Sequence, residues 1–398
     1  MRLAEIATYV NEKISSSNIT LDQYVTTDSL LQDKRGREYA QNLPPVTTNL
    51  IHYQPGDVLV ANIRPYLKKV WFADCEGGAS SDVLVLRAKN ANDTTFVYAL
   101  LMQDSFYDYA MKGAKGSKMP RGDKDQIMRY EFPIFSPEQR KDIGKFITDI
   151  ESKIAVNRQI NDNLEVMAKQ LYDYWFVQFD FPNEEGKPYK SSGGKMVWND
   201  KLKREIPDGW SAKSIFDEMS VQYGFPFSTE DFTEEVTNIP VVRIRDILDN
   251  TISAYSHEET DDKYRLNEAD LLIGMDGNFH MNYWIDNIAY LNQRSVRLRS
   301  KHNSNVSIVQ ARYDIEPYIK AKEQRAKGST VGHLSDKDLK ELKVMVCLNR
   351  RMRDALDSLL YRIIANRKEN LCLTKQRDEL LPLLMNGQVS VNYHLSHD

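Results

Sequence analysis

The stretch IAVNRQIN at residues 154–161 returns as IIANRKEN at residues 363–370. Around both stretches apolar residues recur at alternating spacings of four and three, the seam pattern of a coiled coil. The first seam comprises Ile143, Ile147, Ile150, Ile154, Asn157, Asn161, Leu164, Ala168 and Leu171. The second comprises Met352, Leu356, Leu359, Ile363, Asn366, Asn370, Leu373, Arg377 and Leu380. The sequence therefore predicts two long helices of equivalent pattern.

Both seams carry two asparagines at equivalent positions. A buried asparagine destabilises an apolar seam unless it meets a polar partner, and it then fixes the register of the helices. We therefore predict an antiparallel pair in which Asn157 and Asn161 face Asn370 and Asn366. The alternative is two separate helices, each packed on its own domain, with the asparagines at an exposed edge.

Two further blocks repeat in the same order. GDVLVANIRPYLKKVWFADCE from Gly56 aligns with ADLLIGMDGNFHMNYWIDNIA from Ala269, and GAKGSK at 113–118 aligns with RAKGST at 325–330. A period near 210 residues is too long for a solenoid and indicates a duplicated domain. Short β-branched segments precede each helix and favour a mixed α/β globule in each half.

These patterns predict an α+β protein with two mixed α/β domains in a pseudo-two-fold repeat, joined by a long antiparallel two-helix coiled coil. Pro, Gly, Ser and charged residues mark the intervening stretch as a loop. The expected division is 1–136 for the first domain, 137–179 for the first helix, 180–210 for the linker, 211–346 for the second domain, 347–387 for the second helix and 388–398 for a tail.

Composition excludes several classes of protein. Three cysteines in 398 residues exclude a disulfide scaffold and a cysteine-rich zinc site. The N-terminus lacks the pattern of a signal peptide, and no stretch is apolar enough to span a membrane, so a cytoplasmic protein without membrane contact is expected. Because neither a P-loop nor a glycine-rich S-adenosylmethionine loop is present, the chain has the pattern of a binder without catalytic or metal-binding residues.

The net charge of −4 hides a segregation of charge. Residues 217–270 hold 14 acidic and 4 basic residues, whereas residues 294–353 hold 15 basic and 6 acidic residues. Basic residues gather around both A-K-G-S blocks: Lys112, Lys115, Lys118 and Arg121 in the first half, and Lys322, Arg325 and Lys327 in the second. Two such loops predict contacts to the phosphates of a duplex. The alternative for each is an ordinary solvated face.

Loops between the strands supply the residue types that contact base edges in the major groove. The candidates are Asn62, Arg64, Tyr66, Lys68 and Lys69 in the first half, and Arg243, Arg245, Asn278, His280, Asn282, Tyr283, Asn292, Gln293 and Arg294 in the second. Taken alone, Arg243 and Arg245 also suit the outer face of a strand, and Asn278 suits a tight turn.

The chain resembles the DNA-specificity subunit of type I restriction-modification enzymes. The resemblance rests on GDVLVANIRPYLKK, NRQINDNLEVMAKQLYDYWFVQFDF, REIPDGW, IPVVRIRDI, GSTVGHLSDKDLKELKV and KQRDELLPLLMNGQVSV, and it covers almost the full length. It implies two target-recognition domains, each followed by a long helix, which agrees with the repeat.

The resemblance also implies partners and a mechanism. Each domain would recognise one half of a bipartite, asymmetric double-stranded DNA site, and the paired helices would set the gap between the halves. Two modification subunits would hold S-adenosylmethionine and methylate adenines, and restriction or translocase subunits would join them, while this chain would bind no cofactor. The outer surfaces of the helices, near Gln170, Tyr172, Trp175 and Leu381, would dock the modification subunits.

Two other functions stay open at this point. One is an assembly scaffold that does not contact DNA. The other is a single-chain methyltransferase or nuclease whose motifs are not recognisable, which would act without partners.

Overall fold

The computed structural model describes residues 1–236, 238–326, 332–347 and 349–391. The chain forms two compact units, one from residues 1–155 with 371–398 and the other from residues 156–370. Each unit contains part of both long helices, α5 (Pro137–Tyr172) and α9 (Arg350–Met385). Together the sheets and helices make the α+β fold that the sequence predicts.

The first unit is built on two four-stranded sheets. One has the order β1-β8-β5-β6 and the other the order β2-β4-β7-β3. Their strands are β1 (Ala7–Tyr9), β8 (Val83–Ala88), β5 (Val58–Ala61), β6 (Val70–Phe72), β2 (Lys13–Ser15), β4 (Asn49–Tyr53), β7 (Gly77–Ala79) and β3 (Tyr24–Val25). The helices are α1 (Leu3–Ile6), α2 (Thr94–Leu101), α3 (Asp104–Lys112) and α4 (Lys124–Met128), with 3-10 turns η1 (Ser16–Asn18), η2 (Leu21–Gln23), η3 (Pro65–Leu67) and η4 (Ala91–Asp93).

The second unit repeats this plan. Its sheets have the orders β12-β19-β16-β17 and β13-β15-β14-β18. Their strands are β12 (Met219–Tyr223), β19 (Ser295–Ser300), β16 (Leu271–Gly274), β17 (Met281–Tyr283), β13 (Phe232–Thr233), β15 (Ala254–Ser256), β14 (Ile239–Val242) and β18 (Tyr290–Leu291). The helices are α6 (Ile215–Glu218), α7 (Ile308–Ala326) and α8 (Asp336–Glu341), with 3-10 turns η6 (Thr229–Asp231), η7 (Ile244–Asp246) and η8 (Asp262–Tyr264).

The same buried ion pair anchors the central sheet of each unit. Arg87 donates to both carboxylate oxygens of Asp57 at 2.8 Å, and Arg299 donates to both oxygens of Asp270 at 2.6 Å. Asp57 and Asp270 align in the sequence repeat and are both buried. The duplication inferred from sequence is therefore present in the fold. Within the acidic stretch 217–270, the buried carboxylate of Asp270 is thus balanced by the half-buried Arg299.

The segment expected to be a linker is more ordered than its composition indicates. Within 180–210, β9 (Met196–Asn199) pairs antiparallel with β10 (Arg204–Pro207). Just beyond it, β11 (Ser211–Ser214) pairs with β20 (Lys343–Val346). The expectation of a loop was wrong for the hairpin of β9 and β10, because its apolar residues, such as Ile206, are buried in the core of the second unit.

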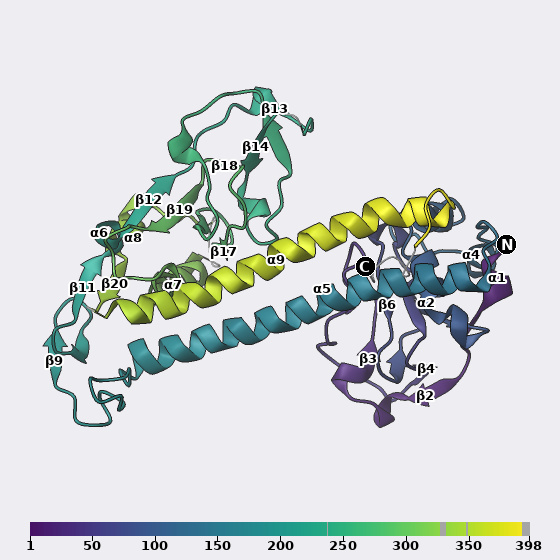
Figure 1. Cartoon of the computed structure of the whole chain (residues 1–398), viewed down its shortest axis with the longest axis horizontal. Coiled ribbons are helices and arrows are strands. Elements are labelled where there is room, and N and C mark those ends of the chain that lie inside the picture. The colour runs from purple at the N-terminus through teal and green to yellow at the C-terminus, as the bar shows by residue number, and fades with distance from the viewer. Residues whose placement is uncertain (237, 327–331, 348, 392–398) are drawn as a thin grey trace, which may run out of the picture. The chain divides into compact units, whose positions relative to one another are not determined.

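The long helices pair as predicted (Figure 1). The side chain of Ser136 caps the first turn of α5, and α5 continues to Tyr172 before a π-helical turn, η5 (Asp173–Val177). In the second unit Asn157 Nδ2 donates to Asn370 Oδ1 at 2.9 Å, and Asn366 Nδ2 donates to Asn161 Oδ1 at 2.9 Å. Because the partner number falls as the residue number rises, the pair is antiparallel.

The first unit contains the other end of the pair. There Arg377 occupies a seam position, is 3% exposed, and donates to Glu151 Oε1 at 2.6 Å. Ile143 and Ile147 of α5 and Leu381 of α9 belong to the same buried core of this unit. The helices are therefore integral to the core of each unit.

Candidate nucleic-acid interface

A surface pocket of about 520 Å³ in the second unit collects most of the base-contacting residues predicted for the second half of the chain. Its lining comprises Arg243, Ile244, Arg245, Asp276, Asn278, His280, Asn292, Gln293 and Arg294. Seven of these nine residues were predicted from the sequence, although they come from three separate loops. We call this site the second-unit pocket.

Strand ends deliver these residues to one place. η7 follows β14, the turn 275–280 joins β16 to β17, and the turn 292–294 joins β18 to β19. Gly277, at φ +71°, allows the first of these turns, and a Cβ there would meet open space. Arg294 also has a left-handed backbone, at φ +62°, which is unusual for a residue with a long side chain.

The two arginines of the VVRIRDI segment have different roles. Arg243 Nη2 donates to the carbonyl and the hydroxyl of Ser253 at 2.7 and 2.6 Å, and its backbone N–H donates to Asp246. The side chain of Arg245 is exposed at the pocket. Arg243 therefore holds the loop together, while Arg245 is placed to meet a ligand.

A carboxylate outside the set of predicted site residues, Asp276, binds a histidine and an arginine at this site. Asp276 Oδ1 accepts from His333 Nδ1 at 2.6 Å, and Asp276 Oδ2 lies 3.2 Å from Arg294 Nη1. The His333 and Arg294 side chains are 58% and 71% exposed, whereas Asp276 is 20% exposed. The only sequence signal that Asp276 and His333 lie together is the repeat, in which these two residues align with Ile63 and Arg121.

Three backbone hydrogen bonds join the loops of this site, and the first unit has the same three. In the second unit they run from Met275 N to Arg294 O, from Leu334 N to Met275 O and from Gly277 N to Gly332 O. In the first unit they run from Asn62 N to Asp82 O, from Gly122 N to Asn62 O and from Arg64 N to Pro120 O. We call this meeting point of three loops the junction. In both units the junction brings the strand-end loop together with the segment that follows the A-K-G-S block, residues 120–122 in the first unit and 332–334 in the second.

Around the first-unit junction, several predicted residues are free to meet a ligand. The exposed ones are Arg64, Tyr66, Lys112, Lys115, Lys118 and Arg121. Arg121 Nη2 lies 2.8 Å from Asp82 Oδ1, and Lys115 Nζ lies 3.6 Å from Asp123 Oδ2. This surface has more exposed basic than acidic groups, as contacts to phosphates require.

Other predicted residues of the first unit are engaged inside it. Asn62 is 4% exposed, which conflicts with a direct contact to a base. Lys68 lies 3.0 Å from Asp104, and Lys69 donates to the carbonyl of Thr27. Burial lowers the pKa of Lys69. The partners of Lys68 and Lys69 lie in distant segments of the chain. The two lysines therefore hold the loop at η3 in place.

The second unit requires similar corrections. Asn282 Nδ2 donates to the carbonyls of Ile247 and Leu248 at 3.2 and 2.7 Å, and Asn282 Oδ1 accepts from Arg367 at 3.0 Å. Tyr283 is 5% exposed, and burial raises its pKa. Neither side chain is placed to contact a base, because the half-buried Asn282 amide is already hydrogen-bonded to backbone carbonyls and Tyr283 is buried.

The second basic cluster is described only in part. Lys322 Nζ donates to Asp338 Oδ1 at 2.7 Å, so its charge is already balanced. Arg325 is exposed near the end of α7, and Lys327 lies outside the described residues.

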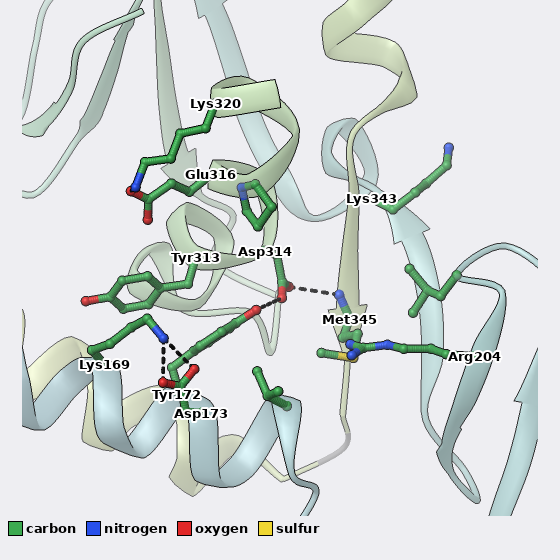
Figure 2. Close-up of a pocket in the computed structure, with 13 residues that line it drawn as sticks. Lys169, Tyr172, Asp173, Arg204, Tyr313, Asp314, Glu316, Lys320, Lys343 and Met345 are labelled. Atoms are coloured by element: carbon green, nitrogen blue, oxygen red, sulfur yellow. Dashed lines mark hydrogen bonds and ion pairs between the residues drawn. The ribbon is translucent and has the colours of Figure 1, made fainter. Parts of the chain in front are cut away.

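A second pocket, of about 560 Å³, lies where α5, α7 and β20 meet in the second unit (Figure 2). Asp314 accepts from the Tyr172 hydroxyl at 2.9 Å and from the Met345 N–H at 3.0 Å. Burial raises the pKa of Asp314 to about 6, although these hydrogen bonds oppose the shift. Tyr172 is 8% exposed. Its expected role in docking a partner was therefore wrong, and it anchors the end of α5 instead.

Among the described residues, three or more histidine, cysteine, aspartate or glutamate side chains do not gather in a way that could hold a metal ion. Within the same ranges, no helix combines the length and apolarity needed to cross a membrane.

A family model described as the type I restriction modification DNA specificity domain matches residues 1–166 and again residues 207–371. The chain belongs to this family. The two matched segments correspond to the two halves of the repeat, and each contains one junction.

Relatives agree with this assignment. The chain is 24% identical over 314 residues to the type I restriction enzyme MjaIX specificity subunit of Methanocaldococcus jannaschii, covering 74% of this chain and 69% of the relative. It is 26% identical over 186 residues to the EcoBI specificity subunit of Escherichia coli, covering 45% and 37%. The fold matches the crystal structure of a type I restriction-modification S subunit from M. genitalium, with a TM-score of 0.59, 14% identity, and 97% and 95% of the two chains covered.

Proposed function

We propose that this chain is the sequence-recognition subunit of a type I restriction-modification complex, with one half of a bipartite DNA site recognised by each unit. The observation that carries the proposal is the second-unit pocket, where seven predicted base-contacting residues from three loops converge. The equivalent junction in the first unit supplies a second surface of the same plan.

The chemistry of these surfaces suits DNA. Arg245, Gln293 and Asn278 are exposed donors of the kind that pair with guanine and adenine edges. In the first unit, Lys112, Lys115 and Lys118 lie beside the junction and are suited to phosphates, which position the duplex without specifying its sequence.

In this proposal the chain itself performs no chemistry. Two modification subunits would carry S-adenosylmethionine and methylate an adenine of each half-site after flipping it from the duplex. Restriction or translocase subunits would join the same assembly. The paired helices would act as the spacer that sets the unspecified gap between the half-sites.

An exposed row that runs along α5 into η5 supports docking of a helical partner. The row comprises Val156, Ile160, Met167, Tyr174 and Val177, each between 37% and 49% exposed. They follow a spacing of four, seven, seven and three, which fits a second heptad seam on the outer face of the helix. We propose that a modification subunit covers this row.

Methylome sequencing tests the function. A host that carries the chain should show adenine methylation at a two-part sequence with a fixed gap, and a deletion strain should lose it. Methylation that persists in the deletion strain, or methyl transfer by the purified chain alone, would contradict the proposal. Retained duplex binding after Lys112, Lys115 and Lys118 are all changed to Gln would favour the scaffold alternative.

A further inference from the structure

Each junction contains one arginine that is held by one carboxylate. In the first unit the pair is Arg121 with Asp82, and in the second unit it is Arg294 with Asp276. The two pairs occupy different positions of the repeat, because Arg294 aligns with Asp82, and the residue that aligns with Arg121 is His333. In the first unit the arginine follows the A-K-G-S block. In the second unit it lies in the turn 292–294, and its carboxylate lies in the turn 275–280.

A carboxylate on a surface that approaches phosphates weakens binding by repulsion, so its presence at both junctions needs a reason. The distances supply one. Asp82 contacts Nη2 of Arg121, and Asp276 contacts Nη1 of Arg294, so most of the guanidinium donors stay available. The carboxylate restricts the rotamers of the arginine. The guanidinium edge that donates two parallel hydrogen bonds stays open.

Both arginines are exposed enough to reach a groove, at 58% for Arg121 and 71% for Arg294. Arg294 also has a left-handed backbone, a conformation in which glycine or asparagine is ordinary and arginine is disfavoured. A strained backbone at an exposed arginine that an ion pair orients indicates that this side chain has a function.

From these observations, and resting on the proposed function, we infer that Arg121 and Arg294 are the guanine-contacting residues of the two half-sites and that Asp82 and Asp276 are their positioning residues. A planar guanidinium donates two parallel hydrogen bonds to O6 and N7 of guanine, an arrangement that the other bases do not offer. Each half of the recognised sequence should therefore contain a guanine that depends on one arginine of one unit.

The test uses the full chain in its native host, with the methylated motif determined for each variant. Arg294→Gln should abolish the requirement for one guanine in one half-site, with discrimination falling about tenfold or more, or ~1.4 kcal/mol. Arg121→Gln should do the same in the other half-site only. Arg294→Lys should retain part of the guanine preference, because lysine also donates to guanine.

The carboxylates provide the second arm. Asp276→Asn should weaken the same guanine position as Arg294→Gln, by a smaller factor, and Asp82→Asn should do so for Arg121. Asp261→Asn is the matched control, because Asp261 is an exposed, lysine-paired carboxylate outside the pocket. It should leave the motif unchanged.

Three results would overturn the inference: a wild-type motif without guanine in one of its halves, arginine variants with an unchanged motif, or loss of preference in both halves from one arginine change. By contrast, a wild-type host without any bipartite methylation would refute the proposed function itself. The two failures are therefore distinguishable.

Discussion

The side-chain amide of Asn157 donates to Asn370 Oδ1 at 2.9 Å and to Glu369 Oε2 at 2.6 Å. Asn157 is 1% exposed, so these contacts lie inside an otherwise apolar seam. The pairing satisfies a polar group that would be costly to bury alone, and its effect on register stays a prediction.

Replacing Asn157 by leucine should lower the free energy of unfolding by about 1–3 kcal/mol, because Asn370 loses a donor within the seam and the exposed Glu369 loses one beside it. The double variant Asn157→Leu with Asn370→Leu should recover much of that loss but permit shifted helix pairings. Urea denaturation measures the first effect, and cysteine cross-linking between α5 and α9 measures the second. A double variant that keeps a single register would refute a role for the asparagines in fixing it.

The exposed lysines beside the first-unit junction should contribute to affinity through phosphates. Lys115→Gln combined with Lys118→Gln should weaken binding of any duplex and reduce the slope of log affinity against log salt by about 0.9 per lost contact. Lys203→Gln, an exposed lysine elsewhere, is the control. An unchanged salt slope would place these lysines off the DNA.

Asn282 should affect stability and leave specificity intact. Its hydrogen bonds to Ile247, Leu248 and Arg367 predict that Asn282→Ala lowers the free energy of unfolding by about 1–3 kcal/mol. The methylated motif of this variant should equal that of the wild type. A motif altered at one base, in a chain of normal stability, would show that Asn282 contacts DNA after all.

Asp314 should make stability depend on pH. Burial raises its pKa to about 6 from an ordinary value of 3.8. Between these values the folded chain retains a proton that the unfolded chain has released, so the free energy of unfolding should fall as pH rises from about 4 to 6. The change is on the order of 2 kcal/mol. Asp314→Asn should flatten this dependence in denaturation curves measured from pH 4 to pH 8.

Asp338 offers a control of opposite sign. Partial burial alone would raise the pKa of Asp338, but hydrogen bonds from Lys322 and Ser335 hold it well below its usual range. Its contribution is therefore present above pH 4 and is lost as the pH falls further. If Asp314→Asn and Asp338→Asn changed the pH profile in the same direction, the assignment of Asp314 would be wrong.

The amino-acid sequence by itself determined the duplication, the antiparallel helices and the residue types of the loops that carry the predicted base-contacting residues. A repeat is visible by comparing the chain with itself, and helix periodicity depends only on neighbouring residues. The sequence marked Arg245, Asn278 and Arg294 as candidates in loops between strands, and their convergence on one pocket is a finding of the structure.

Only the tertiary structure decided which of those polar side chains are free. In the sequence, Asn282 and Arg245 are equally good candidates for contacting a base. In the structure, the Asn282 amide donates to carbonyls 34 and 35 residues away, whereas Arg245 is exposed. The pairing of Asp276 with His333 spans 57 residues and likewise has no local signal. The physical reason is that a polar group is satisfied by whatever donor or acceptor the fold brings to it, and distant segments supply most of these partners.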